Sequence, residues 1–278
     1  MGSSMAKNLA ARGHSLTLYN RSHEKAAALA KATGMKTAST IAEAVKSNEY
    51  IFLMVGYPKD VEETFYSHGG VFESALPGTI VVDMTTSSPS LAAKLHEDGK
   101  KRGLRVLDAP VSGGDSGARN ATLSIMAGGD EKDFEAAKPL FEGLGKNITY
   151  LGPAGSGQHA KAANQIAVAG ATAAYTEALA YARSVGLDPY KMLQAIGTGA
   201  AGSWQLANMA PRALQGDFAP GFYIKHFIKD MHIIDAEMSQ RGLSLAVVKT
   251  VLSLYEKMAQ KGLQDDGTQA LIKLYSEK

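Results

Sequence analysis

The sequence predicts an α/β protein in which a mainly parallel, helix-covered sheet is followed by an all-helical domain. In the first half, short β-branched runs alternate with helical stretches, which is typical of a covered parallel sheet. From Gln158 to Val185 the chain has no proline and one glycine, which predicts a single helix about 40 Å long. Only helical patterns follow. We therefore expect two domains, 1–152 and 153–278, joined by the long helix 158–185.

Apolar runs predict the strands of the first domain, at 15–20, 50–55, 79–84, 104–110, 122–129 and 147–152. A helix is expected at 23–34, because Ser22 is a favourable N-cap and Glu24 lies in the first turn. In the second domain, Asp188 and Pro189 predict a helix start, since proline is favoured at the first helical position. Further helices are expected at 203–214, 223–241, 244–261 and 267–276.

The opening residues, MGSSMAKNLAARGHSLTLYNRS, resemble the second half of a dinucleotide-binding βαβ unit. Such a unit begins with a strand and a G-x-G-x-x-G turn, of which Gly2 would be the third glycine. The first helical turn would then face a pyrophosphate. We therefore expect a Rossmann-type doubly wound sheet that is N-terminally truncated here, by a misassigned start or a deletion. The complete protein is expected to carry the missing strand and both glycines.

The end of the next strand predicts which dinucleotide binds. An acid about 20 residues after the third glycine binds the ribose 2′-hydroxyl of NAD. This chain instead has Asn20, Arg21 and Ser22. Arg21 can pair with a 2′-phosphate and Ser22 can add a hydrogen bond. NADP(H) is therefore expected to be preferred, with NAD(H) possible; the competing interpretation of Arg21 is an ordinary surface arginine.

Two glycine-rich stretches carry candidate chemistry. Ser112, Gly113 and Gly114 follow a predicted strand, where ligands bind in open α/β sheets, and consecutive backbone N–H groups suit a carboxylate. A plain glycine turn would give the same letters. Later, GPAGSGQHAKAANQ opens the long helix, with Lys161 one turn inside it. A lysine on an apolar helix either snorkels to solvent or serves chemistry, and partial burial would suit it as a proton donor.

Other polar side chains accompany this lysine. Asn164 and Gln165 share its helix face, at spacings of three and four residues, and could hold a substrate hydroxyl. In FYIKHFIKDMH, Lys225 and Lys229 are one turn apart. A solvated basic face is the simpler explanation for Lys225.

Composition excludes several classes of protein. The net charge is +2 with 20% charged residues, so no nucleic-acid partner is expected. There is no cysteine, which excludes disulfides and thiolate metal ligands, and no metal site is expected. No apolar run is long enough for a membrane span, and no signal peptide is evident. A cytoplasmic protein acting on a small molecule is therefore expected.

Taken together, these stretches resemble the β-hydroxyacid dehydrogenases, the family of 3-hydroxyisobutyrate dehydrogenase and tartronate semialdehyde reductase. DAPVSGG is similar to the family's substrate-binding motif and GSGQHAKAANQ to its catalytic-lysine helix; MAKNL and IKDM also occur at matching places. The resemblance implies that Lys161 is the general acid and base and that the serine-glycine-glycine turn holds the substrate carboxylate. It also implies cofactor contacts for Lys229 and for Thr86, in DMTTSSP, and assembly as a homodimer or homotetramer.

Two alternatives remain open from the sequence. The 6-phosphogluconate dehydrogenases also have Ser-Gly-Gly and a catalytic lysine, but they carry His-Asn where this chain has Asn164 and Gln165. The pair found here is similar to tartronate semialdehyde reductases and favours a small semialdehyde or glyoxylate. A non-catalytic nucleotide-binding paralogue is the other alternative, which the absent glycines favour and Lys161 disfavours.

Overall fold

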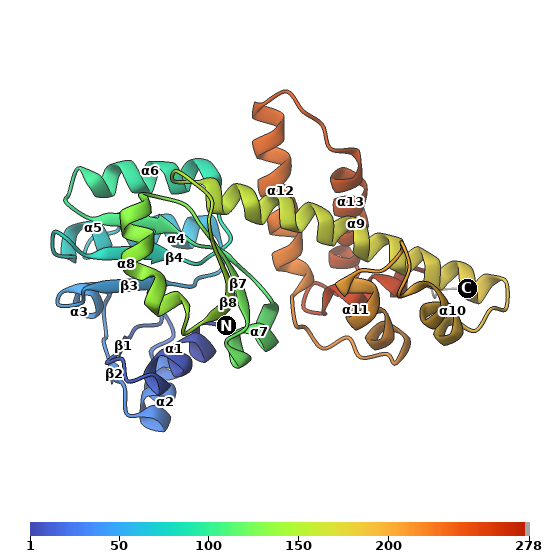
Figure 1. Ribbon diagram of the computed structural model, residues 1–278, viewed down its shortest axis with the longest axis horizontal. Helices are drawn as coiled ribbons and strands as arrows, with labels where there is room; N and C mark the ends of the chain where they lie inside the picture. The colour runs from blue at the N-terminus through green and yellow to red at the C-terminus, as the bar shows by residue number, and fades with distance from the viewer. Residues whose placement is uncertain (276–278) are drawn as a thin grey trace. The chain divides into compact units, whose positions relative to one another are not determined.

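A computed structural model describes residues 1–275, and the chain divides into two compact units, Met1–Lys161 and Ala162–Lys278. The predicted boundary at residue 152 precedes the long helix α9 (Ser156–Ser184), whereas this division lies inside it. Each unit is described separately. Figure 1 shows strands and helices alternating in the first unit and helices in the second, so the predicted α/β fold class is confirmed.

The strands of the first unit form a mainly parallel arrangement. The central strands pair in the order β3 (Tyr50–Leu53), β4 (Ile80–Asp83) and β5 (Arg105–Asp108), all parallel. A second parallel pair joins β7 (Leu123–Ala127) to β8 (Gly145–Tyr150), and a third joins β1 (Thr17–Leu18) to β2 (Lys36–Thr37). Strand β2 and the short strand β6 (Val111–Ser112) were not expected from the sequence.

Strand β6 is the exception to parallel pairing. It follows β5 after only Ala109 and Pro110 and pairs antiparallel with β7, and Asp108 at the end of β5 likewise forms an antiparallel bridge with Gly128. The consequence for function is that Ser112 is the last residue of an antiparallel strand, opposite Ser124.

Helices cover both faces of the central strands. Ile80 and Val82 of β4 lie in one apolar cluster with Met5 of α1 (Gly2–Ala11), whereas Val81 lies in another with Phe65. Successive side chains of a strand point to opposite faces, so a strand buried on both faces is apolar throughout. The remaining helices of this unit are α2 (His23–Thr33), α3 (Ile41–Val45), α4 (Pro58–Tyr66), α5 (Val71–Ser74), α6 (Pro89–Lys100), α7 (Gly114–Asn120) and α8 (Glu131–Phe141).

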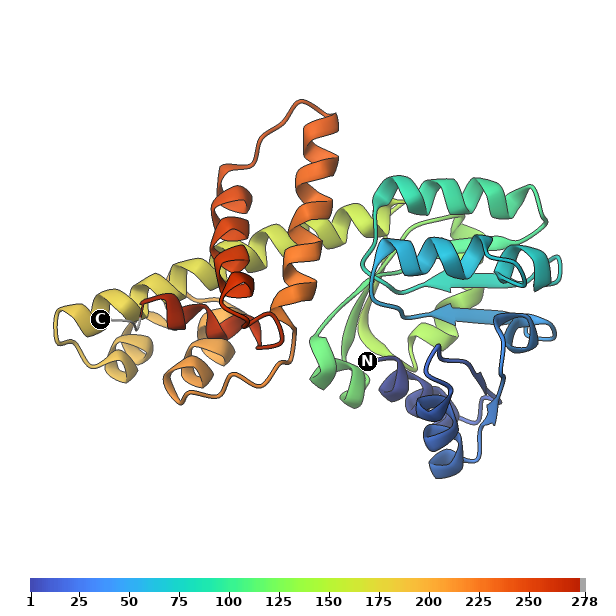
Figure 2. The ribbon, with the colours of Figure 1, turned by 180° about the vertical axis from the view of Figure 1, so that it is seen from behind.

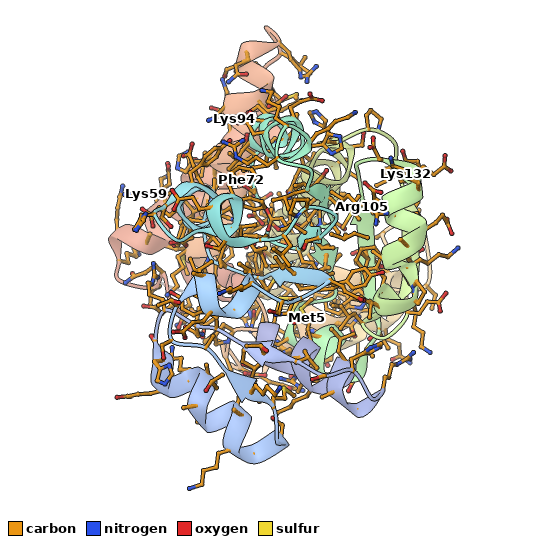
Figure 3. The ribbon with its side chains drawn as sticks, turned by 90° about the vertical axis from the view of Figure 1, so that its left-hand side faces the viewer. Met5, Lys59, Phe72, Lys94, Arg105 and Lys132 are labelled. Atoms are coloured by element: carbon orange, nitrogen blue, oxygen red, sulfur yellow. The ribbon has the colours of Figure 1, made fainter. Side chains whose placement is uncertain are left out.

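Side-chain placement in the first unit follows the same division between core and surface. In Figure 3, Lys59, Lys94 and Lys132 extend at the periphery, whereas Met5 and Phe72 lie within the body of the unit. Met5 is 5% exposed, and Phe72 packs edge-on against Tyr66 of α4. The apolar interior is therefore continuous from α1 to the central strands on one side and from α4 and α5 on the other.

The second unit is helical, as predicted. After α9 come α10 (Pro189–Ile196), α11 (Trp204–Leu214), α12 (Ile224–Gln240) and α13 (Ala246–Gln260). Figure 2 shows α12 and α13 side by side, and the buried rings of Phe227 and Tyr255 pack edge to face between them. The helix expected at 267–276 is a 3-10 helix at Thr268–Tyr275, and residue 276 lies outside the described residues.

The two predicted N-caps have different outcomes. The Asp188 side chain accepts hydrogen bonds from the backbone N–H groups of Tyr190 and Lys191, as expected. Ser22 occupies the N-cap position of α2, but its side chain makes no capping bond. Its N–H instead donates to Asn20 Oδ1 at 2.9 Å, so Asn20 organises this turn.

Among the described residues, no helix combines the length and apolar content needed to cross a membrane. The expected N-terminal strand and the expected cytoplasmic location stay predictions.

Candidate active site

The carboxyl end of β5 fixes the start of the lysine-bearing helix. Asp108, the last residue of β5, is 3% exposed. Its Oδ1 accepts a hydrogen bond from Gly155 N at 2.8 Å, and its Oδ2 accepts one from Gln158 N at 2.9 Å. These bonds satisfy N–H groups that a helix N-terminus leaves without intrahelical partners. Burial raises the pKa of the Asp108 carboxyl, and the amide hydrogen bonds oppose that rise.

Glycine is required where this helix meets the strands. A Cβ at Gly157 would overlap the Met126 carbonyl oxygen and lie 2.8 Å from Asp108 Oδ2. Gly155 has a φ of +91°, which L side chains rarely adopt. The glycines of GSGQHAK therefore allow α9 to begin against β5 and β7.

Lys161 follows one turn after this anchored start. The residue is 7% exposed, so its side chain does not extend into solvent as the snorkelling alternative requires. A buried lysine in a fixed helix turn is a group that can hold and transfer a proton at a defined place.

The loop after β4 is attached to the same helix turn. Gln158 Nε2 donates to the Thr85 carbonyl oxygen at 2.8 Å, and Gln158 Oε1 accepts from Ser87 N at 2.9 Å. Thr86 lies between these two residues and is partly exposed, whereas Thr85 and Ser87 are buried. The first unit thus connects two predicted elements, the Thr86 loop and the Lys161 helix, through Gln158.

The serine-glycine-glycine turn follows the same strand, β5, whose last residue anchors α9. It follows Asp108 by way of β6, so the strand that anchors α9 also leads directly to Ser112. Gly113 and Gly114 have φ values of +127° and +60°, both in the range that favours glycine. Any L side chain at either position would strain the turn, so the backbone conformation by itself explains why both residues are glycine.

The predicted nucleotide residues form an exposed turn after β1. Asn20, Arg21 and Ser22 are all exposed, and Arg21 Nη1 lies 3.1 Å from Asp60 Oδ1. The Arg21 side chain is 83% exposed, and a surface ion pair is worth only about 0–1 kcal/mol. A phosphate can therefore compete for this guanidinium, and the donors present fit a 2′-phosphate.

Gly2 opens α1, as predicted, but the expected reason for glycine there is not evident. A Cβ at this position would lie 3.6 Å from Met54 Cβ, an ordinary van der Waals distance. Close packing of helix and strand therefore does not by itself require glycine.

The second unit contains the other predicted residues in one polar chain. Asn164 Nδ2 donates to Gln165 Oε1 at 2.7 Å, and Gln165 Nε2 donates to Asp230 Oδ2 at 2.6 Å. Lys229 Nζ lies 2.9 Å from Asp230 Oδ1, an ionic contact without the angles of a hydrogen bond. Asp230 is 2% exposed and thus orders both Gln165 and Lys229.

The two lysines of α12 differ, as the sequence suggested. The Lys229 side chain is 11% exposed, whereas that of Lys225 is 41% exposed and pairs with Asp265 at 2.6 Å. Lys225 therefore belongs to a solvated surface.

Sequence reasoning missed three buried polar residues that fix candidate side chains: Asp108 and Gln158 in the first unit and Asp230 in the second. Each lay inside a quoted motif. The sequence feature that could have revealed them is an acidic or amide residue at the end of an apolar strand or within an apolar helix. A polar group buried in such a place needs a hydrogen-bond partner.

These features define a dinucleotide-dependent oxidoreductase: a Rossmann-like unit that contains a buried lysine and a serine-glycine-glycine turn. Residues 1–152 match the family model for the NAD binding domain of 6-phosphogluconate dehydrogenase, and residues 155–275 match the one for the NAD-binding of NADP-dependent 3-hydroxyisobutyrate dehydrogenase. The chain belongs to the β-hydroxyacid dehydrogenase family.

Individual relatives agree with this assignment. An uncharacterized oxidoreductase of Bacillus subtilis is 49% identical, over 99% of this chain and 95% of the relative. The 2-hydroxy-3-oxopropionate reductase of Escherichia coli is 40% identical, over 94% of this chain and 89% of the relative. A solved 3-hydroxyisobutyrate dehydrogenase of Mycobacterium tuberculosis, with L-serine, superposes with a TM-score of 0.91 at 28% identity, covering 100% of this chain and 96% of that one.

Proposed function

We propose that this protein transfers a hydride between NADP(H) and a small β-hydroxyacid or its semialdehyde, of the 3-hydroxyisobutyrate, tartronate semialdehyde or glyoxylate type. The observation that carries the proposal is the burial of Lys161, 7% exposed, one turn after a helix start held by Asp108. The 40% identity to a 2-hydroxy-3-oxopropionate reductase supports the semialdehyde end of this range.

Lys161 is proposed as the proton shuttle. NADP(H), when bound, supplies or accepts the hydride at the substrate carbon. Reduction leaves negative charge on the carbonyl oxygen, and Lys161 Nζ donates a proton to that oxygen; in oxidation it takes the hydroxyl proton. Positioned proton transfer of this kind contributes roughly 10²–10⁴-fold to a rate.

The remaining residues are proposed to bind and orient. Ser112, Gly113 and Gly114 offer a hydroxyl and consecutive N–H groups to the substrate carboxylate. Asn164 and Gln165 are proposed to hold a substrate hydroxyl, with Gln165 fixed by Asp230. The proposed cofactor contacts are Gly2, Asn20, Arg21, Ser22, Thr86 and Lys229.

Preference for NADP(H) over NAD(H) is proposed from Arg21. Its exposed guanidinium suits a doubly charged 2′-phosphate, and its contact with Asp60 is weak enough to be displaced.

Assembly into a homodimer or homotetramer is proposed for the second unit. Several large apolar side chains there are strongly exposed, and contact between copies of the chain would bury them. They are Tyr181, Val185, Leu187, Tyr190 and Trp204. Light scattering coupled to size-exclusion chromatography measures the assembly directly, and a monomer at all concentrations would contradict this proposal.

One experiment separates the proposal from its alternatives. Purified protein is mixed with NADPH and a panel containing tartronate semialdehyde, glyoxylate and the semialdehyde of 3-hydroxyisobutyrate, and the loss of NADPH absorbance is followed; 6-phosphogluconate with NADP is tested in the oxidative direction. Turnover of a small semialdehyde acid supports the proposal. Turnover of 6-phosphogluconate alone favours the first alternative, and the absence of any turnover favours a non-catalytic paralogue.

A further inference from the structure

The peptide groups on both sides of Thr86 are held by one side chain. The Thr85 carbonyl belongs to the peptide bond before Thr86, and the Ser87 N–H belongs to the bond after it. Gln158 accepts from the second at 2.9 Å and donates to the first at 2.8 Å. A carboxamide that pairs with both flanking peptides restrains the φ and ψ of the residue between them.

The clamping side chain is itself rigidly placed. Gln158 is 1% exposed, and its own backbone N–H donates to Asp108 Oδ2. The loop is fixed from its other side, because Thr85 N donates to Asp83 Oδ1 at 2.9 Å and Thr85 Oγ1 accepts from Val55 N at 3.0 Å. Thr86 is the partly exposed residue within this buried frame.

We propose that Gln158 is a positioning residue for the reaction, setting the direction of Thr86 from the same helix turn that presents Lys161. This inference rests on the proposed function. Gln158 and Lys161 are three residues apart on α9 and so lie on neighbouring positions of one helix face. The Gln158 carboxamide therefore couples the position of the Thr86 loop, the proposed cofactor contact, to the position of Lys161, the proposed proton donor.

Gln158→Glu tests the clamp because it keeps the shape and changes one donor into an acceptor. When the introduced carboxyl is protonated, its O–H donates to the Thr85 carbonyl and its other oxygen accepts from Ser87 N. When it is ionised, both oxygens are acceptors, and one faces the Thr85 carbonyl. Burial and the nearby Asp83 and Asp108 carboxylates favour the protonated form, whereas Lys161 favours ionisation.

The expected result is a new pH dependence. At pH 6, the dissociation constants of Gln158→Glu and wild type for NADPH should agree within about threefold. At pH 9, the dissociation constant of the variant should be at least about tenfold higher than that of wild type. Gln158→Met, which loses both bonds, should bind NADPH about tenfold or more weakly at every pH. Gln194→Glu, on the exposed part of α10, is the control and should follow wild type.

Hydrogen exchange at the Ser87 amide gives a readout without turnover. Its exchange should be at least about tenfold faster in Gln158→Met than in wild type, because the acceptor is lost. If wild type turns over no substrate, the proposed function fails, yet the Ser87 amide and NADPH titrations still decide the clamp. If Gln158→Met binds NADPH as tightly as wild type, or if Ser87 exchanges equally fast in the two proteins, the clamp is wrong.

Discussion

Asp108 and Gln158, 50 residues apart in the chain, meet where β5 ends and α9 begins, with Asp108 Oδ2 2.9 Å from Gln158 N. The same carboxylate holds Gly155 N through its other oxygen. The end of β5 therefore fixes where α9 begins, and with it where Lys161 lies relative to the strands of the first unit.

Asp108→Asn should lower both activity and stability. An asparagine keeps one acceptor but turns an N–H₂ group toward an amide N–H, which leaves a buried donor without a partner. The expected loss is about 1–3 kcal/mol of unfolding free energy, together with a lower kcat. Urea unfolding and steady-state rates measure the two effects. Asp235→Asn, on the outer part of α12, should change neither; an equally stable and active Asp108→Asn would show that the anchor is unimportant.

Substrate binding by the glycine turn is tested at Gly114. Gly114→Val places a branched side chain at a φ of +60° and displaces the N–H groups proposed to hold the carboxylate. Loss of one charge-assisted hydrogen bond should raise KM by roughly ten- to a hundredfold. Gly34→Val is the control, since its φ is +72° and a Cβ there has nothing within 4 Å. An uncharged amide of the best substrate that is reduced as well as the acid would contradict the assignment.

Much of this arrangement followed from the sequence, because it depends on local pattern. Alternating apolar runs gave the parallel strands, and Asp188 with Pro189 marked the start of α10. Strand β6 was missed because a two-residue strand has no periodicity of its own and exists only through its pairing with β7.

Long-range contacts explain what else could not be predicted. Ser22 was expected to cap α2, but Asn20 competes for the same turn, and only the three-dimensional structure shows which residue does so. The bonds of Asp108 and Gln158 join residues 50 and 71 or more positions apart. No spacing rule connects such pairs, although each is a polar residue in an apolar context that needs a partner.

Cofactor preference is tested at Arg21. Arg21→Ala should reduce the NADPH-to-NADH affinity ratio by roughly ten- to a hundredfold, since a charge-assisted pair is worth about 1.5–3 kcal/mol. Asp60→Asn frees Arg21 from its surface contact and should raise the same ratio by no more than about fivefold. Fluorescence titration with both cofactors measures the ratios. A ratio that Arg21→Ala leaves unchanged would show that another residue recognises the 2′-phosphate.

The acid stability of the second unit is tested at His226. Burial, with the Lys229 and Lys225 charges, lowers the pKa of His226 below its ordinary value of 6.5. Because the folded pKa is lower than the unfolded one, this group contributes stability above about pH 6.5 that is lost as the pH falls toward the folded pKa. His226→Gln should therefore lose less stability than wild type between pH 7 and pH 5 in urea unfolding. An identical loss in both proteins would remove His226 as the cause.

The central claim is that Lys161 transfers the proton, and single-turnover reduction of the best semialdehyde acid by Lys161→Met tests it most directly. Methionine retains most of the buried stem, and Lys225→Met, on the solvated face of α12, is the matched control. We predict that the rate falls by roughly 10²–10⁴-fold with NADPH affinity unchanged, whereas the control reacts as wild type. Reduction by Lys161→Met at a rate close to that of wild type would contradict the account.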